Sequence, residues 1–440
     1  MFDSRRFPVI AVTFVLALGA ACGEPLGPGP DGPEPPLEEL PRPLTASEAV
    51  VVERSNTFGI ELLREVLEVD DRTNVVLSPL SASMVLAMTL NGAAGTTLDG
   101  MRTALRLEGL SHAEINDSYR GLTGLLTDLD PLVEVSIANS AWANERYSFH
   151  QAFFDAVTDH FDGTVESRDF GDPNTLSEIN AWVDSSTRGL IERILREGDL
   201  DPDQALLLLN AVYFDGPWRT GFDPEDTAPG LFMRADGSTV SVEMMHLTDV
   251  ELPYGRTDDL VAVELPYGGG AYSMVVALPW DGTPREVLAG MDASGWKALI
   301  ASLEPRVLDG LSLPRFVMAY DSFLNDALTD MGMEIAFTRQ ADFSDLSPQP
   351  LCMDFVRQKT FIEVDEAGTR AAAVTAVGIG PVSFFGFLVD RPFLFAIRER
   401  LSGTILFVGV IGDPAASDAE PPEFPAPCSQ RVWRGQTNPG

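Results

Sequence analysis

Basic residues are scarce in this 440-residue chain. It has 30 lysines and arginines against 66 aspartates and glutamates, which gives a formal net charge of −36. No stretch gathers enough positive charge to neutralise the phosphates of a nucleic acid or the sulfates of heparin. We therefore expect neither polyanion among the partners of this protein.

Cysteine and histidine, which often hold metals or perform catalysis, are also rare. The three cysteines, Cys22, Cys352 and Cys428, are too few and too scattered for a zinc site or a small disulfide framework. None of the four histidines forms a His-Glu-x-x-His pair or lies beside a recognisable nucleophile motif. The sequence predicts no metal, no cofactor and no enzymatic activity. A hydrolase is a disfavoured alternative, which turnover of small esters or peptides would reveal.

The N-terminus has the layout of an export signal. Two arginines precede an apolar run from Val9 to Leu18, and three small residues lead from there to Cys22. The run is about half of the ~20 residues that a membrane-spanning helix needs, so residues 1–21 are expected to be a cleaved signal peptide. A cysteine after small residues resembles a bacterial lipoprotein signal, in which the thiol is acylated. Cys22 is thus a candidate lipid-attachment site, with plain secretion as the alternative.

Composition divides the rest of the chain into three parts. Residues 22–44 are rich in proline and glycine and predict an extended tether. Residues 45–413 contain the periodic apolar patterns of a folded domain, and residues 414–440 predict a loose, disordered tail. An exported protein could pair Cys352 with Cys428, and two unpaired thiols are the alternative.

The domain has helical patterns mostly in its first half and strand patterns mostly in its second half. Thr45 and Glu48 have capping-box spacing before an amphipathic helix, and Thr175 and Glu178 predict a second box. The hydrophobic content of 45% is ample for a large core. This order favours an α+β domain with antiparallel or mixed sheets.

The unusual segment runs from Glu366 to Ser383. It joins two predicted strands without helix caps or a tight hairpin, and links of this length are usually functional. Read with period two, one face carries only threonine and alanine, whereas Arg370 lies on the other face. Small side chains could slide into an existing sheet without overpacking it. The pattern predicts a mobile loop that can become a strand.

Several motifs in the right order resemble the serpin family over nearly all of Leu44 to Pro414. They are Asn74 with Ser78–Ser81, the run Leu209–Trp218, Leu313–Arg315, Phe361–Thr369 and, most specifically, Leu388–Ile397. The resemblance implies a serpin-like α+β fold with three β-sheets, about eight or nine helices and an exposed reactive-centre loop. It also implies a monomer without cofactors. The export signal adds a location: either a cell-envelope lipoprotein that contacts the membrane only through its lipid, or an extracellular protein.

Serpins are suicide inhibitors of serine, and sometimes cysteine, proteases. By resemblance, the protease attacks the loop, and the cut loop inserts into a large sheet before the acyl-enzyme is hydrolysed. The hinge of the loop resembles that of inhibitory members; its residues are Glu366, Gly368, Thr369, Ala371, Ala372 and Ala373. The alternative is a non-inhibitory serpin that acts as a binding or structural protein.

The family's spacing places the reactive bond at Val382–Ser383, with a register that could slip by one residue. A small β-branched Val382 suits the shallow apolar pocket of elastase-like or some subtilisin-like proteases. Trypsin-like targets are disfavoured, because they need arginine or lysine at this position.

Two further groups match family positions that control opening of the sheet. Ser78, Ser81, Asn210 and Gln358 match the shutter, the hydrogen-bonded group that lets the sheet part. Gln358 replaces a histidine common in the family, so opening there would not respond to protonation. Arg315, Glu366 and Trp218 match the breach, the top of the sheet where the loop first enters.

Overall fold

The computed structural model describes residues 35–369, 385–416, 425, 427–428 and 431. Within them lie nine α-helices: α1 (Ala46–Val69), α2 (Pro79–Leu90), α3 (Gly95–Ala104), α4 (His112–Thr127), α5 (Gln151–Phe161), α6 (Pro173–Ser186), α7 (Pro284–Gly290), α8 (Ala293–Ala301) and α9 (Asn325–Leu328). The predicted signal peptide, Cys22, most of the predicted tether, the residues of the predicted loop beyond Thr369 and most of the predicted tail lie outside the described residues.

The strands form three sheets, so the α+β expectation is confirmed. The first eight are β1 (Asn74–Leu77), β2 (Glu134–Asn144), β3 (Thr164–Arg168), β4 (Leu206–Pro217), β5 (Ala228–Met233), β6 (Thr239–Arg256), β7 (Leu260–Pro266) and β8 (Tyr272–Pro279). The rest are β9 (Glu304–Pro314), β10 (Phe316–Phe323), β11 (Arg357–Val364), β12 (Gly368–Thr369), β13 (Gly386–Leu388), β14 (Phe393–Glu399) and β15 (Ile405–Ile411).

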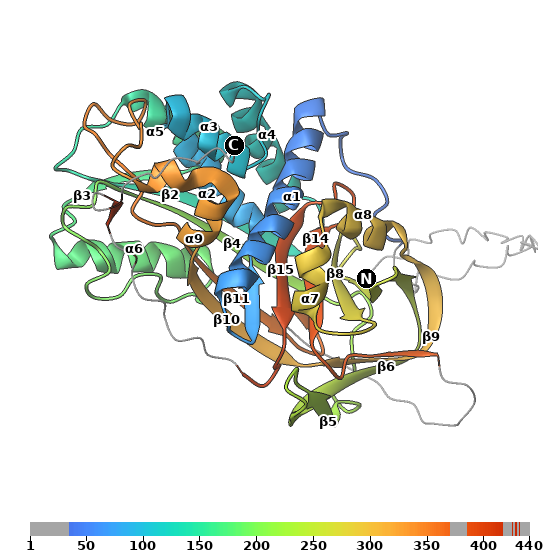
Figure 1. Ribbon diagram of the computed structural model, residues 1–440. Helices are drawn as coiled ribbons and strands as arrows, with labels where there is room; N and C mark the ends of the chain where they lie inside the picture. The colour runs from blue at the N-terminus through green and yellow to red at the C-terminus, as the bar shows by residue number, and fades with distance from the viewer. Residues whose placement is uncertain (1–34, 370–384, 417–424, 426, 429–430, 432–440) are drawn as a thin grey trace, which may run out of the picture. The chain divides into compact units, whose positions relative to one another are not determined.

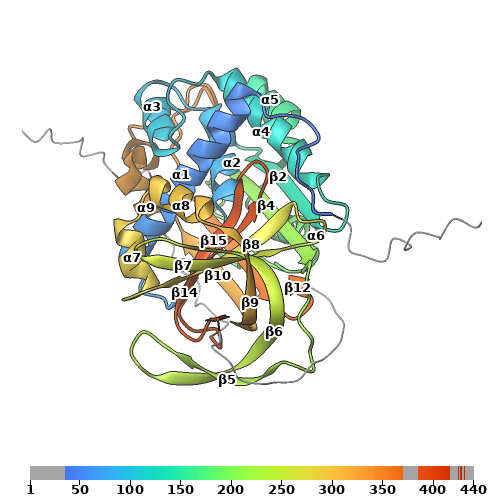
Figure 2. The same ribbon diagram turned by 90° about the vertical axis from the view of Figure 1, so that its right-hand side faces the viewer.

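The sheet order separates one large sheet from two smaller ones. The large sheet runs β1-β15-β14-β8-β7-β6-β9-β13, with β5 paired to β6. The smaller sheets are β12-β4-β2-β3 and β10-β11. Figure 1 shows α1 beside β14 and β15, and Figure 2 shows α7 and α8 on the flank of β7 and β8. The main core fills the space between these helices and the large sheet.

Local capping signals explain where two helices begin. The Thr45 hydroxyl accepts from the Glu48 N–H at 3.1 Å, and the Glu48 carboxylate accepts from the Thr45 N–H at 2.7 Å. The first predicted capping box is therefore confirmed. The second prediction is wrong. α6 begins at Pro173 with Asp172 as its N-cap, because that carboxylate is placed to accept the Asn174 N–H at 2.9 Å.

Both ends of the described domain are held to its surface. Leu37, Leu40 and Leu44 pack against the main core, although the sequence predicts them to lie in the tether. At the other end, Cys428 forms a disulfide with Cys352, with 5.9 Å between the Cα atoms. The paired alternative for these cysteines therefore holds in the structure, and it fixes one point of the segment that composition predicts to be loose.

Reduction of this disulfide is expected to destabilise the protein. The bond closes a loop across a sequence separation of 76 residues, and such a link typically contributes about 2–4 kcal/mol by restricting the unfolded chain. Urea denaturation should show a loss of this size for Cys428→Ser, whereas Cys22→Ser should leave the curve unchanged. Equal curves with and without reductant would show that the two thiols are unpaired in solution.

Candidate functional site

The hinge of the predicted loop already lies along the edge of a sheet. Gly368 and Thr369 form β12, which pairs antiparallel with the end of β4 opposite Pro217 and Gly216. Gly368 has a φ of +147°, and a Cβ at this position would lie 2.2 Å from the Gly216 carbonyl oxygen. Only glycine fits so close to a neighbouring backbone. Gly368 and Thr369 of the predicted hinge thus already form a short strand on β4.

Trp218 holds the turn that leads into this hinge. Its backbone N–H donates to the Ala367 carbonyl at 2.8 Å, and its indole Nε1 donates to the Asp365 carbonyl at 2.8 Å. The indole ring stacks on Tyr267 with 4.4 Å between ring centroids and 12° between planes. The buried indole therefore positions the chain just before the hinge.

Glu366 is fixed in the same turn. Its carboxylate accepts from the Thr227 hydroxyl at 2.8 Å, and its carbonyl accepts from the Phe222 N–H at 2.9 Å. Arg315 lies 3.8 Å from the carboxylate and is half exposed, so the ion pair is weak. The structure thus brings the three predicted breach residues together: Arg315, Glu366 and Trp218. Thr227 binds Glu366 more closely than Arg315 does.

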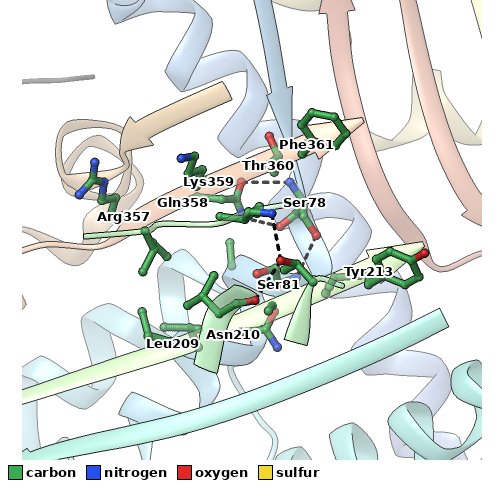
Figure 3. Close-up of a pocket in the computed structure, with 18 of the residues that line it drawn as sticks. Ser78, Ser81, Leu209, Asn210, Tyr213, Arg357, Gln358, Lys359, Thr360 and Phe361 are labelled. Carbon is green, nitrogen blue, oxygen red and sulfur yellow. Dashed lines mark hydrogen bonds between the residues drawn. The ribbon is translucent and has the colours of Figure 1, made fainter. Parts of the chain in front are cut away.

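A cavity separates β4 from β11. Over the described residues, β4 pairs with β2 and β12, and β11 pairs with β10 alone, so no ladder joins β4 to β11. The cavity between them is lined by Leu208–Phe214 of β4 and by Val356 with Arg357–Ile362 of β11. The first turns of α2 and the segment after α6 close its sides. Figure 3 shows the two strands facing each other across it. We call this space the slot, because each wall presents the edge of a strand.

Three of the four predicted shutter residues meet on one side of the slot. The Gln358 amide accepts from the Ser78 N–H at 3.0 Å and donates to the Ser78 carbonyl at 2.8 Å. Ser78 also caps α2, since its hydroxyl accepts from the Ser81 N–H at 3.3 Å. Gln358 therefore links β11 to the start of α2 by both donating and accepting, as an amide can.

Asn210 lies on the other wall of the slot and is not part of that group (Figure 3). Its amide nitrogen donates to Asn139 Oδ1 at 2.7 Å, on the neighbouring strand β2. Among the described residues, no protein group donates a hydrogen bond to its buried Oδ1 atom. A buried acceptor that accepts no hydrogen bond costs free energy, so a donor brought next to this atom would stabilise the protein.

A set of charged side chains, which the sequence analysis did not predict, ties the segment after α6 to β11. Arg357 is buried and donates to Asp321 at 2.9 Å and to Asp199 at 2.9 Å. Burial lowers the pKa of Arg357, but its hydrogen bonds and charge interactions with the two carboxylates outweigh burial and raise it. Lys359 donates to the Arg193 carbonyl at 2.8 Å, and burial lowers the pKa of this ammonium group.

These contacts cover the slot on the α6 side. Asn180 of α6 binds the backbone of Ile194 and Leu195 at 2.8 to 3.0 Å, so the segment is anchored to α6 as well as to β11. Asp199 is 158 residues from Arg357. No local pattern in a single sequence connects residues so far apart, which explains why the prediction missed them.

The remaining predicted positions lie outside the described residues. These are Ala371, Ala372, Ala373, Val382, Ser383 and Cys22. Over the residues that are described, no group of acidic, histidine or cysteine side chains is arranged to hold a metal ion. Within the same ranges, no helix is both long enough and apolar enough to cross a membrane.

Comparison with known proteins identifies the fold. A family model described as "Serpin (serine protease inhibitor)" matches residues 53–414. Plasminogen activator inhibitor 1 of Sus scrofa is 33% identical over 374 residues, which cover 81% of this chain and 91% of that protein. A serpin-like protein of Thermococcus kodakarensis is 33% identical over 435 residues, covering 93% and 99% of the two chains. The crystal structure of tengpin, a thermophilic serpin in the native state, matches with a TM-score of 0.75 and 32% identity, covering 86% of this chain and 96% of that one.

Proposed function

This chain belongs to the serpin family, and from that premise we propose that it is a suicide inhibitor of serine proteases with elastase-like or subtilisin-like specificity. Proteins of this family are generally protease inhibitors rather than enzymes. The observation that carries the proposal is the slot between β4 and β11 together with a hinge already paired to β4. A cut loop would find one strand edge on each side and its own first residues in place.

The pairing of the hinge sets the register for insertion. Continuing from Thr369 opposite Gly216, one residue at a time, places Ala371 opposite Phe214 and Ala373 opposite Val212. Phe214 is part of the main core and Val212 packs against it. Directly opposite residues in an antiparallel pair point to the same face, so both alanines would be buried on insertion. The small side chains of the hinge would therefore occupy the core-facing positions beside β4, where a larger side chain would not fit.

The same register offers a hydrogen-bond donor for the Oδ1 atom of Asn210 in the slot. Thr375 falls opposite Asn210, whose Oδ1 atom accepts no hydrogen bond from the residues that the structure describes. The threonine hydroxyl would supply the missing donor once the loop is inserted. Asn210, which lies apart from the other shutter residues in the uncut chain, would then contribute to the stability of the inserted state.

The chemistry follows the family's order of events. The protease serine attacks the carbonyl carbon of Val382, the bond to Ser383 breaks, and an acyl-enzyme forms. Insertion of ~15 residues at ~3.3 Å per residue then carries the enzyme about 50 Å along the sheet, which distorts its active site before water can release it. The work is supplied by folding free energy that the uncut chain does not release.

Mixing the protein with elastase and separating the products on a denaturing gel tests this function. A covalent complex is expected, and mass spectrometry of the released fragment should show a new N-terminus at Ser383 or one residue away. Simple cleavage without a complex, by every serine or cysteine protease tried, would leave the non-inhibitory alternative.

Replacing Thr375 by valine is expected to weaken the cleaved form alone. Valine keeps the shape of threonine but removes the donor, so Asn210 Oδ1 would stay unpaired in the inserted state, at a cost of about 1–3 kcal/mol. Denaturation of cleaved protein should show this loss, and uncut protein should not change. Thr375→Ser, which keeps the hydroxyl, is the control. Equal stability of the cleaved valine variant and the cleaved parent would rule out the contact.

A further inference from the structure

A loop lies at the lower end of the slot, where β4 begins. Residues 338–356, which we call the foot loop, connect the helical turn Glu334–Phe337 to β11. A second cavity lies between the foot loop and Leu206–Leu209 of β4. Val356 and Arg357 line both this cavity and the slot, so the two spaces adjoin. The foot loop therefore lies at the end of the slot that is furthest from the hinge.

The foot loop joins the two walls of the slot. On one side it continues directly into β11. On the other side, its Leu346 carbonyl accepts from the His150 N–H at 2.9 Å. The Oε1 atom of Gln349 accepts from the Ser148 N–H at 2.9 Å. Both donors follow β2, which pairs with β4. If β4 moves away from β11, the foot loop must therefore stretch or these bonds must break.

Two residues near the C-terminus hold the ends of the foot loop, and we call them the clamp. Cys428 forms the disulfide with Cys352, and its N–H donates to Asp354 Oδ1 at 2.9 Å. Arg431 donates from its guanidinium to the Asp354 carbonyl at 3.1 Å. Its own carbonyl accepts from the Arg339 N–H at 3.4 Å, at the other end of the loop. The clamp thus links the start of the foot loop to its last residues.

The clamp also satisfies a carboxylate in the foot loop. Burial raises the pKa of Asp354, and the Cys428 N–H and the charge of Arg431 oppose that rise. If the clamp left, the carboxylate would lose both of these interactions. A disulfide that only cross-links the chain acts mainly on the unfolded state. These contacts show that the bond also fixes a set of interactions in the folded state.

We propose that the Cys352–Cys428 disulfide is a redox switch that controls how readily the slot opens. This inference rests on the proposed function, since it takes the slot as the place where a strand enters. A strand lies about 4.8 Å from each neighbour, so β4 and β11 must stand about 10 Å apart to receive one. The foot loop has to follow that movement. With the disulfide formed its ends are held, and after reduction the loop can give way.

Reduction of the bond needs a dithiol. One thiolate of the dithiol attacks the sulfur of Cys352, the S–S bond breaks, and Cys428 leaves as a thiolate that takes up a proton. The second thiol of the reductant then displaces Cys352, which also ends as a thiol, and the reductant becomes a cyclic disulfide. Two electrons pass from the dithiol to the protein. Cys352 is half-buried and Cys428 is buried, so attack is expected at Cys352.

The rate at which the uncut protein takes up a strand tests the switch. The probe is a fluorescein-labelled synthetic peptide with the sequence of residues 369–380, and its migration with the protein on a native gel reports uptake. Dithiothreitol is expected to raise the uptake rate about tenfold, as a modest fall in the opening barrier would do. Cys428→Ser should show the fast rate with or without reductant. Cys22→Ser is the control and should keep the full response of the parent.

A second variant separates the switch from a general loss of stability. Gln349→Ala removes the acceptor for the Ser148 N–H but leaves the disulfide intact. It should speed uptake by the oxidised protein about threefold, and reduction should then add less than it adds in the parent, because both changes release the same loop. Gln151→Ala is the matched control, since the amide of Gln151 donates within its own helix, to Asp155. This variant should behave like the parent.

Each result decides the switch separately from the inhibitory function. Uptake rates that agree within twofold in the two redox states overturn the switch, and so does an absence of uptake in both states. Purely additive effects of reduction and Gln349→Ala also overturn it, because the bond and the foot loop would then act independently. The elastase gel decides the inhibitory function on its own. If that gel shows only cleavage, yet uptake responds to dithiothreitol as expected, the switch stands and the inhibitory function fails.

Discussion

Replacing Ala373 by glutamate is expected to turn this protein from an inhibitor of elastase into a substrate. In the register set by β12, Ala373 falls opposite Val212 on the face of β4 that packs against the core. A carboxylate there must be buried without a partner or protonated, and either costs several kcal/mol. Insertion of the cut loop would then be slower than hydrolysis of the acyl-enzyme, and the protease would be released in active form.

The measurement is the stoichiometry of inhibition, the moles of chain consumed for each mole of protease inactivated. It should rise at least tenfold for Ala373→Glu, because about 1.4 kcal/mol on the insertion barrier already changes the partition by that factor. Arg370→Glu is the matched control. Its position has the opposite parity and falls opposite Asp215, which is only half-buried, so the stoichiometry should stay within about threefold. An unchanged stoichiometry for Ala373→Glu would show that this residue does not enter the sheet.

Replacing Gly368 by alanine is expected to detach the hinge from β4. The new Cβ would lie 2.2 Å from the Gly216 carbonyl oxygen and 2.6 Å from Pro217 Cα, and backbone atoms cannot move aside as a flexible side chain can. The positive φ adds strain of about 1–3 kcal/mol. The loop would then start insertion from outside the sheet.

The expected result for Gly368→Ala is a several-fold higher stoichiometry of inhibition, with elastase attacking the loop at the parent rate. Gly124→Ala is a suitable control, because no atom lies within 4 Å of the added methyl group. If the Gly368 variant inhibits as well as the parent, the pairing of β12 with β4 is dispensable and the proposed register loses its starting point.

Local patterns predicted the parts of the site that depend on neighbouring residues. Small side chains on one face of the hinge indicated a segment able to form a strand, and Gly368 and Thr369 do form one. The capping box at Thr45 was predicted for the same reason, since its partners are three residues apart. Asp172 was missed because Thr175 and Glu178 mimic the spacing of a box one turn later.

Features that depend on distant segments could not be predicted in the same way. Resemblance grouped Asn210 with Ser78, Ser81 and Gln358, but the open slot places it on the opposite wall with Asn139. The link from Arg357 to Asp199 joins two elements that only the folded chain brings together.

We propose that the uncut chain is held short of its most stable fold and that one cut in the loop lets it reach that fold. Calorimetry of intact protein and of protein cut at the 382–383 bond tests it most directly. We expect the cut form to melt at least about 10 °C higher, because the loop would have become a strand between β4 and β11. Equal melting temperatures, with the severed loop still open to further proteolysis, would contradict it.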